Sequence, residues 1–79
     1  MLQRRHYIVL ADAMAGGFQF GVEPYQRPEA YTTRRAAWRA TVEALTANLK
    51  TNNANFDLAT FQTYIAEKTG HTVRHLFEE

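Results

Sequence analysis

Three histidines, His6, His71 and His75, are the side chains in this 79-residue sequence with the most versatile chemistry. His71 and His75 lie four residues apart, a spacing that places two imidazoles on one helix face and suits a metal ion. A zinc site needs at least one further protein ligand, and the nearby glutamates are typical of surface charges. We also expect a helix to begin between the two histidines, which spoils the geometry. The sequence therefore predicts no metal site and no cofactor.

The remaining side chains are poorly suited to nucleophilic or acid-base catalysis. The sequence contains no cysteine and no serine, and its threonines fit caps, turns and helix surfaces better than activated nucleophiles. Acid-base catalysis by paired carboxylates would require Asp12, Glu43 or Asp57 to meet in a cleft. Asp57 is better explained as a helix cap. We therefore expect a protein that is not an enzyme.

The segment from residue 61 to 77 is similar in outline to a helix-turn-helix, with the turn at Gly70. In this alternative the second helix would read DNA, and the side chains placed to contact bases or phosphates are Thr72, Arg74 and His75. His71 counts against it, because an apolar residue normally fills that turn position. Two glutamates at the end of the chain would also repel phosphate. Two short helices separated by a glycine cap are the simpler interpretation.

Aromatic and basic side chains between residues 18 and 39 form a candidate surface for binding a protein. A short chain can hardly leave several rings in water, so the rings are either a lid over the core or a binding patch. Homodimerisation through this segment would cover the rings and also give them a binding role. The arginines at the start of the helix are explained most simply as a solvated helix flank, but cations there oppose the helix dipole, which gives some support to a contact role. The predicted partner-binding residues are Phe18, Phe20, Tyr25, Arg34, Arg35 and Arg39.

The elements that position these side chains follow from apolar spacing. A helical repeat predicts a first helix from about Leu2 to Ala15, ended by the pair Gly16-Gly17. The alternation of apolar and other residues from 18 to 22 then predicts a short extended run. Prolines at 24 and 28 make the rest of this segment a loop. The result is an aromatic, proline-containing loop between the first two helices.

The second helix is predicted by apolar residues at Trp38, Val42, Leu45 and Leu49. Thr32 or Thr33 is the expected cap at its start, and asparagines 52, 53 and 55 end it.

The third helix begins after Asp57, a good N-cap, with Phe56 and Phe61 forming a hydrophobic staple across the cap. Gly70 closes it. Thr72 is the expected cap of a last short helix to Phe77.

Composition limits the protein to one small packed domain, residues 1–79. Apolar residues make up 46% and charged residues 22%, which excludes a disordered chain, and a net charge of +1 creates no large field toward nucleic acid or membranes. Arg4 and Arg5 before an apolar run mimic a signal peptide, but Asp12 interrupts the run too early. No apolar stretch could span a membrane. We expect a cytoplasmic, all-α, compact three- to four-helix domain.

A further pattern comprises Arg5-His6-Tyr7 with Leu10-Ala11, the helix Trp38, Val42, Leu45 and Leu49, and Asn52, Asn55, Phe56, Asp57 and Phe61. Together these residues resemble a group of short proteins encoded by bacteriophages and plasmids. The resemblance covers about half of the chain. This sequence departs from the group between Gly17 and Pro28 and after Gly70. It implies a cytoplasmic accessory protein that binds a host protein, and it carries over no catalytic residue. The sequence thus predicts a non-enzymatic protein-interaction module whose partner is a host protein or a second copy, with a DNA-binding regulator as the alternative.

Overall fold

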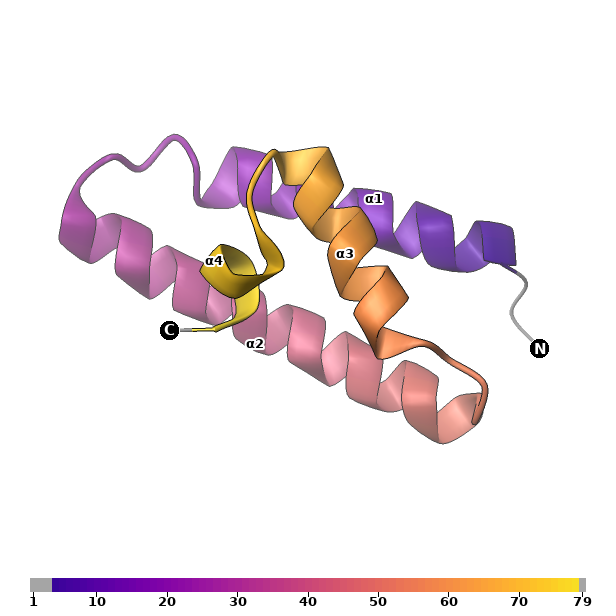
Figure 1. The fold of residues 1–79 in the computed structure, drawn as a ribbon. Coiled ribbons are helices and arrows are strands. Elements are labelled where there is room, and N and C mark those ends of the chain that lie inside the picture. The colour runs from indigo at the N-terminus through magenta and orange to yellow at the C-terminus, as the bar shows by residue number, and fades with distance from the viewer. Residues whose placement is uncertain (1–3, 79) are drawn as a thin grey trace.

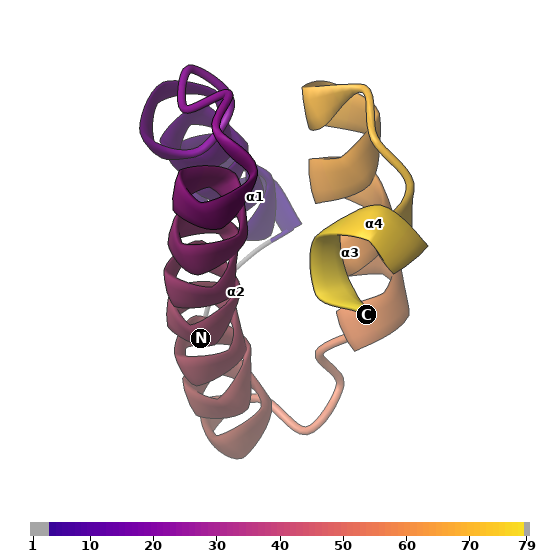
Figure 2. The ribbon, with the colours of Figure 1, turned by 90° about the vertical axis from the view of Figure 1, so that its left-hand side faces the viewer.

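Four helices and no strand make up residues 4–78, the part of the chain that the computed structural model describes (Figure 1). They are α1 (Arg4–Gly21), α2 (Pro28–Asn52), α3 (Leu58–Thr69) and α4 (Val73–Phe77). Seen along the molecule, α1 and α2 lie on one side and α3 with α4 on the other (Figure 2). The predicted all-α class and the three- to four-helix architecture are confirmed.

The first helix, α1, is longer than predicted. It continues from Arg4 through Gly16 and Gly17 to Gly21, and neither Gly16 nor Gly17 adopts a positive φ. The predicted end at Ala15 is therefore wrong, and the predicted start at Leu2 lies outside the described residues.

Burial of Phe18 explains why α1 passes through two glycines. The continued helix places Phe18 on the same face as Ala11 and Ala15, where its side chain is completely buried. Burying a phenylalanine side chain stabilises a fold by about 1.5–3 kcal/mol, whereas glycine in a helix costs about 1 kcal/mol relative to alanine. The burial of Phe18 is therefore comparable to the cost of the two glycines, and Ala15 and Val22 are buried as well. Because residues 18–21 are helical, the extended run predicted for residues 18–22 is wrong.

The connection between α1 and α2 is a tight turn over residues 22–27, shorter than the predicted loop. The amides of Val22 and Glu23 both donate to the carbonyl oxygen of Phe18, at 2.9 and 3.0 Å. The amide of Tyr25 donates to the carbonyl oxygen of Val22 at 3.0 Å. These bonds continue the last turn of α1 and reverse the chain toward α2.

The second helix, α2, starts at Pro28, upstream of both predicted caps. The fixed φ of proline suits the first helical position, where no amide bond is lost. Arg27 occupies the N-cap position without a side-chain hydrogen bond. The predicted cap at Thr32 or Thr33 is therefore wrong.

The boundary between α2 and α3 agrees with the prediction. The helix α2 ends at Asn52, within the predicted asparagine segment. Oδ1 of Asp57 accepts a hydrogen bond from the amide of Thr60 at 3.2 Å, which confirms the N-cap of α3. The rings of Phe56 and Phe61 lie 5.4 Å apart between centroids, as the hydrophobic staple requires.

The end of α3 and the start of α4 also agree with the prediction. Gly70 adopts a left-handed conformation (φ 78°), and its amide donates to the carbonyl oxygen of Ala66 at 3.0 Å. The hydroxyl of Thr72 then accepts the amide of His75 at 3.0 Å and caps α4, which begins at Val73. The last short helix therefore starts between the two histidines.

The core lies between α1 and α3, with α2 and α4 closing one side. Trp38 of α2 joins the layers, because its Nε1 donates to the carbonyl oxygen of Met14 at 2.7 Å and its ring stacks on Phe77 at 5.5 Å. No helix within residues 4–78 has the length and apolar character to cross a membrane. The buried apolar residues are Ala11, Ala15, Phe18, Val22, Trp38, Val42, Leu49, Phe56, Phe61, Ile65, Ala66 and Leu76.

Candidate functional site

Two of the predicted contact residues, Phe18 and Phe20, lie on different faces of α1. The Phe18 ring is packed against Trp38 and Tyr31, with centroids 4.9 and 6.3 Å away. Its side chain is 0% exposed, so Phe18 is a core residue and offers a partner no surface. Phe20, in contrast, is 83% exposed and is available for contact.

The remaining predicted contact residues separate into an outer pair and two inner arginines. The guanidinium of Arg34 lies 3.5 Å from the centre of the Tyr25 ring, and both side chains are exposed. Arg35 turns inward, where its Nη1 donates to the carbonyl oxygen of His75 at 3.2 Å. Arg39 is half-buried. The structure therefore brings Tyr25 and Arg34 together and turns Arg35 toward α4.

The residues of the DNA-binding alternative contribute mainly to internal contacts. The Thr72 hydroxyl caps α4, and the His75 ring is hydrogen-bonded to Tyr31. Arg74 is exposed. Because α4 has only 5 residues, it presents little more than one turn to a DNA groove.

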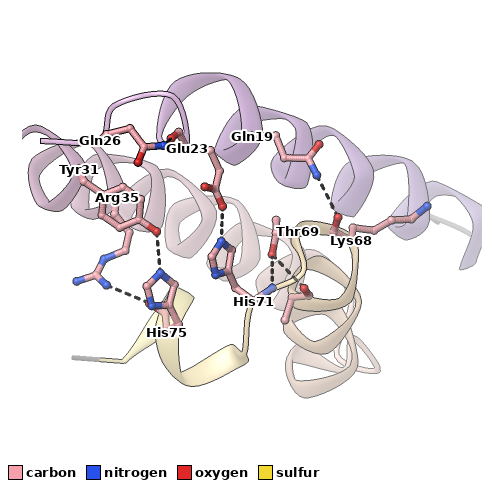
Figure 3. A network of polar contacts seen from close by, with 10 residues as sticks. Gln19, Glu23, Gln26, Tyr31, Arg35, Lys68, Thr69, His71 and His75 are labelled. Atoms are coloured by element: carbon pink, nitrogen blue, oxygen red, sulfur yellow. Dashed lines mark hydrogen bonds and ion pairs between the residues drawn. The ribbon is translucent and has the colours of Figure 1, made fainter. Parts of the chain in front are cut away.

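The two histidines belong to a polar network that ties the C-terminal segment to the rest of the fold (Figure 3). Nε2 of His71 contacts the carboxylate of Glu23, and Nε2 of His75 lies 2.7 Å from the Tyr31 hydroxyl. The two imidazoles stack with centroids 4.6 Å apart. This network joins the turn after α1 and the second helix to α4, and its groups serve docking of that helix.

Burial and charge determine the proton positions in this network. Burial, followed by the electrostatic influence of His71 and of Arg35, lowers the pKa of His75, and Glu23 only partly opposes this shift. Burial and the Glu23 carboxylate raise the pKa of Tyr31. At neutral pH Tyr31 therefore keeps its proton and His75 is uncharged, so the hydroxyl and Nε2 are joined by a hydrogen bond between two neutral groups.

The lowered pKa of His75 predicts a loss of stability in mild acid. The unfolded histidine titrates at about 6.5, so below that pH the unfolded chain binds the proton more readily. The free energy of unfolding should fall from pH 6.5 downward until the folded-state pKa is passed. We expect the melting temperature, followed by circular dichroism from pH 7.5 to about 5, to fall by a few degrees in the wild type and by less in His75→Gln. Equal falls in melting temperature in the wild type and in His75→Gln would contradict the assignment of this pH dependence to His75.

An open cleft lies at the other end of the molecule, between the N-terminal half of α1, the α2–α3 connection and the start of α3. Its volume is about 430 Å³. The walls combine aromatic and aliphatic side chains with a polar rim. The lining residues are Arg4, Tyr7, Ile8, Ala11, Asn53, Asn55, Phe56, Asp57, Thr60, Phe61 and Tyr64.

Hydrogen bonds hold the aromatic walls of this cleft in place. The Tyr64 hydroxyl donates to Oδ1 of Asp12 at 3.2 Å, and Nδ2 of Asn53 donates to the Tyr7 hydroxyl. The ring of Tyr7 also packs against Phe56, with centroids 5.3 Å apart. The cleft is thus largely formed before any ligand binds.

Asp57 supplies a negative charge at the rim. The hydroxyl of Thr60 donates to its Oδ2 at 2.8 Å, and this bond, followed by the Thr60 amide bond, lowers the pKa of the carboxyl group. The carboxylate is therefore ionised at neutral pH, and Asp57 is exposed.

Sequence reasoning did not find this cleft, because it interpreted Phe56 and Phe61 only as the hydrophobic staple at the start of α3. Phe56 and Phe61 are largely buried, but both residues also line the cleft. The available signal was Ile8, an apolar residue outside the repeat that defines the core face of α1. Its side chain is 37% exposed and lines the cleft.

Comparison with known proteins gave no match to any family model, curated protein or solved structure. Within residues 4–78, no group of three or more histidine, aspartate or glutamate side chains is arranged to hold a metal. The open cleft is then the feature that best supports a function.

Proposed function

We propose that this protein is a non-enzymatic binding module that holds an apolar side chain of a partner protein in the cleft between α1 and α3. The observation that carries the proposal is the set of four aromatic rings, Tyr7, Phe56, Phe61 and Tyr64, around an open cleft. Protein complexes are anchored by a few large side chains that enter such pockets inside a polar rim. A volume of about 430 Å³ is at the small end of ligand sites and suits a compact anchor.

The cleft lining carries two opposite charges, Arg4 and Asp57, and the one nearer the start of α3 indicates what should flank the anchor on that side. The ionised carboxylate of Asp57 favours a lysine or arginine beside the apolar residue of the partner, since complementary charges select partners and speed encounter. The partner class is the one that the resemblance to phage- and plasmid-encoded proteins implies, namely a host protein.

A displayed library of random peptides tests the proposal, because it offers the cleft many different anchor residues at once. Peptides selected on the wild-type protein should share a large apolar residue next to a basic one. Their affinity, measured by titration, should fall at least about tenfold in Ile8→Glu, which puts a charge into the cleft. Leu58→Glu is the matched control, because Leu58 is 44% exposed but does not line the cleft.

Two outcomes would refute this function. One is a library that yields no enriched peptide on the wild-type protein. The other is a set of enriched peptides that bind Ile8→Glu and wild type equally well, since these would be bound outside the cleft. Circular dichroism of both variants checks that the fold is intact.

A further inference from the structure

The outer face of α1 (Val9, Ala13, Gly16 and Phe20) lacks the polar character expected of a solvent-facing helix surface. With about 3.6 residues per turn, these four positions form one stripe opposite the buried face of Ala11 and Phe18. Val9 is 64% exposed and Phe20 is 83% exposed. A helix on the surface of a monomer normally carries charged or polar residues there.

Gly16 has no role that the internal packing explains. It lies inside α1 with a negative φ, and a Cβ atom added to it would meet nothing within 4 Å. Alanine would fit there and would favour the helix more than glycine does. Gly16 itself is half-buried, and a glycine between the exposed residues Val9 and Phe20 permits another backbone to approach closely.

We infer that the outer face of α1 is the interface of a homodimer in which two copies of α1 pack antiparallel about a twofold axis. The stripe is complementary to itself in this arrangement. One midpoint along the helix, between residues 14 and 15, is shared by the pair Val9 and Phe20 and by the pair Ala13 and Gly16. A twofold axis at this midpoint places Phe20 against the partner's Val9, and Ala13 against the partner's Gly16, so small residues meet at the crossing and large ones cover both ends.

Charge favours the antiparallel orientation over the parallel one. The first turn of α1 contains Arg4 and Arg5 and no acidic residue, an arrangement that opposes the dipole of its own helix. Antiparallel packing places Arg5 beside the C-terminal end of the partner's α1, where the carbonyl groups carry partial negative charge. Parallel packing would instead bring the two copies of Arg5 together.

The size of the interface predicts a weak, reversible dimer. A helix of 18 residues is about 27 Å long, so the pair buries less than the roughly 800 Å² per partner of a stable complex. We expect a dissociation constant of about 10–1,000 µM. This interface is independent of the cleft and of its proposed function.

Sedimentation velocity over a concentration series tests the dimer. The wild type should shift from monomer toward dimer between about 10 µM and about 1 mM. Phe20→Glu and Gly16→Gln should each weaken the association at least about tenfold. Gly21→Ala is the matched control, because Gly21 also has open space around its Cβ position but lies off the outer face.

The two glycine variants distinguish a loss of dimerisation from a loss of monomer stability. Gly16→Gln and Gly21→Ala should both raise the melting temperature of the dilute monomer, since each replaces a helical glycine by a better helix former. Only Gly16→Gln should also lose the dimer. A structural role for Gly16 in the monomer would instead lower its melting temperature.

Disulfide trapping tests the orientation, because the chain has no cysteine of its own. In an equal mixture of Val9→Cys and Phe20→Cys proteins, mild oxidation should give mainly the mixed disulfide. A parallel pair would give mainly the two symmetric products. A wild type that stays monomeric to about 1 mM, a dimer unaffected by Phe20→Glu and Gly16→Gln, or mainly symmetric disulfides would each overturn the inference.

Discussion

Replacing Phe18 by alanine is expected to lower the free energy of unfolding by about 3–5 kcal/mol. The Phe18 side chain is fully buried and its ring packs on Trp38, Tyr31 and His71, so truncation leaves a cavity where α1, α2 and the C-terminal segment meet. A domain of this size has a total stability of about 4–12 kcal/mol. The substitution therefore removes a large part of it, and equilibrium urea denaturation measures the loss.

Phe20→Ala is the control for this experiment, since it removes the same atoms from the same helix at an exposed position. Its effect should stay within about 0.5 kcal/mol when measured on the dilute protein. Equal destabilisation by the two substitutions would show that the assignment of inner and outer faces of α1 is incorrect.

Replacing Leu76 by alanine is expected to lower the free energy of unfolding by about 2–4 kcal/mol and to release α4 from the body of the protein. The helix has 5 residues, too few to be stable alone, and Leu76 is its fully buried side chain. The hydrogen bonds from Tyr31 and Arg35 to His75 remain possible only while α4 is docked. Loss of the anchor therefore breaks the polar network as well.

Trp38 reports on this release, because it is the only tryptophan in the sequence and Phe77 of α4 stacks on it. Its fluorescence emission should shift to longer wavelength in Leu76→Ala before global unfolding begins. Arg74→Ala, on an exposed position of the same helix, should leave both the emission and the unfolding midpoint unchanged. An unshifted spectrum in Leu76→Ala would mean that α4 stays docked without its anchor.

The helix boundaries that sequence reasoning located correctly are those set by local chemistry. Asp57 caps α3 through the amide three residues ahead, and Gly70 ends it because glycine adopts a left-handed backbone at little cost. Thr72 caps α4 in the same way as Asp57. Each of these signals acts within one turn, so the neighbouring sequence contains all the information.

The boundaries that were missed depend on contacts between distant residues. Whether Gly16-Gly17 ends a helix is decided by what Phe18 can bury against, and Trp38 and His71 come from other parts of the chain. The start of α2 at Pro28 was missed because two threonines further along offered a more familiar cap. At Gly16-Gly17, the burial of Phe18 and its apolar neighbours outweighed the low helix propensity of glycine. At the start of α2, the local sequence offered more than one possible cap.

The cleft was beyond prediction for a related reason. The staple pattern identifies Phe56 and Phe61 as apolar residues that pack on each other, but it does not say that Tyr7 and Ile8 of α1 join them around an open cleft. The outer face of α1 was only partly foreseen. Phe20 was selected as a contact residue, whereas its partners Val9, Ala13 and Gly16 become a surface only once the helix is known to continue through the glycines.

Because α1 packs chiefly on α3, the chain cannot complete its fold early during synthesis. Ribosomes add about 5–20 residues per second, so the residues between these helices take about 2–7 s to synthesise. Throughout that interval the side of α1 that packs on α3 stays uncovered, and the nascent chain is a target for chaperones and proteases. Packing of the core is completed only when α3 and α4 have emerged.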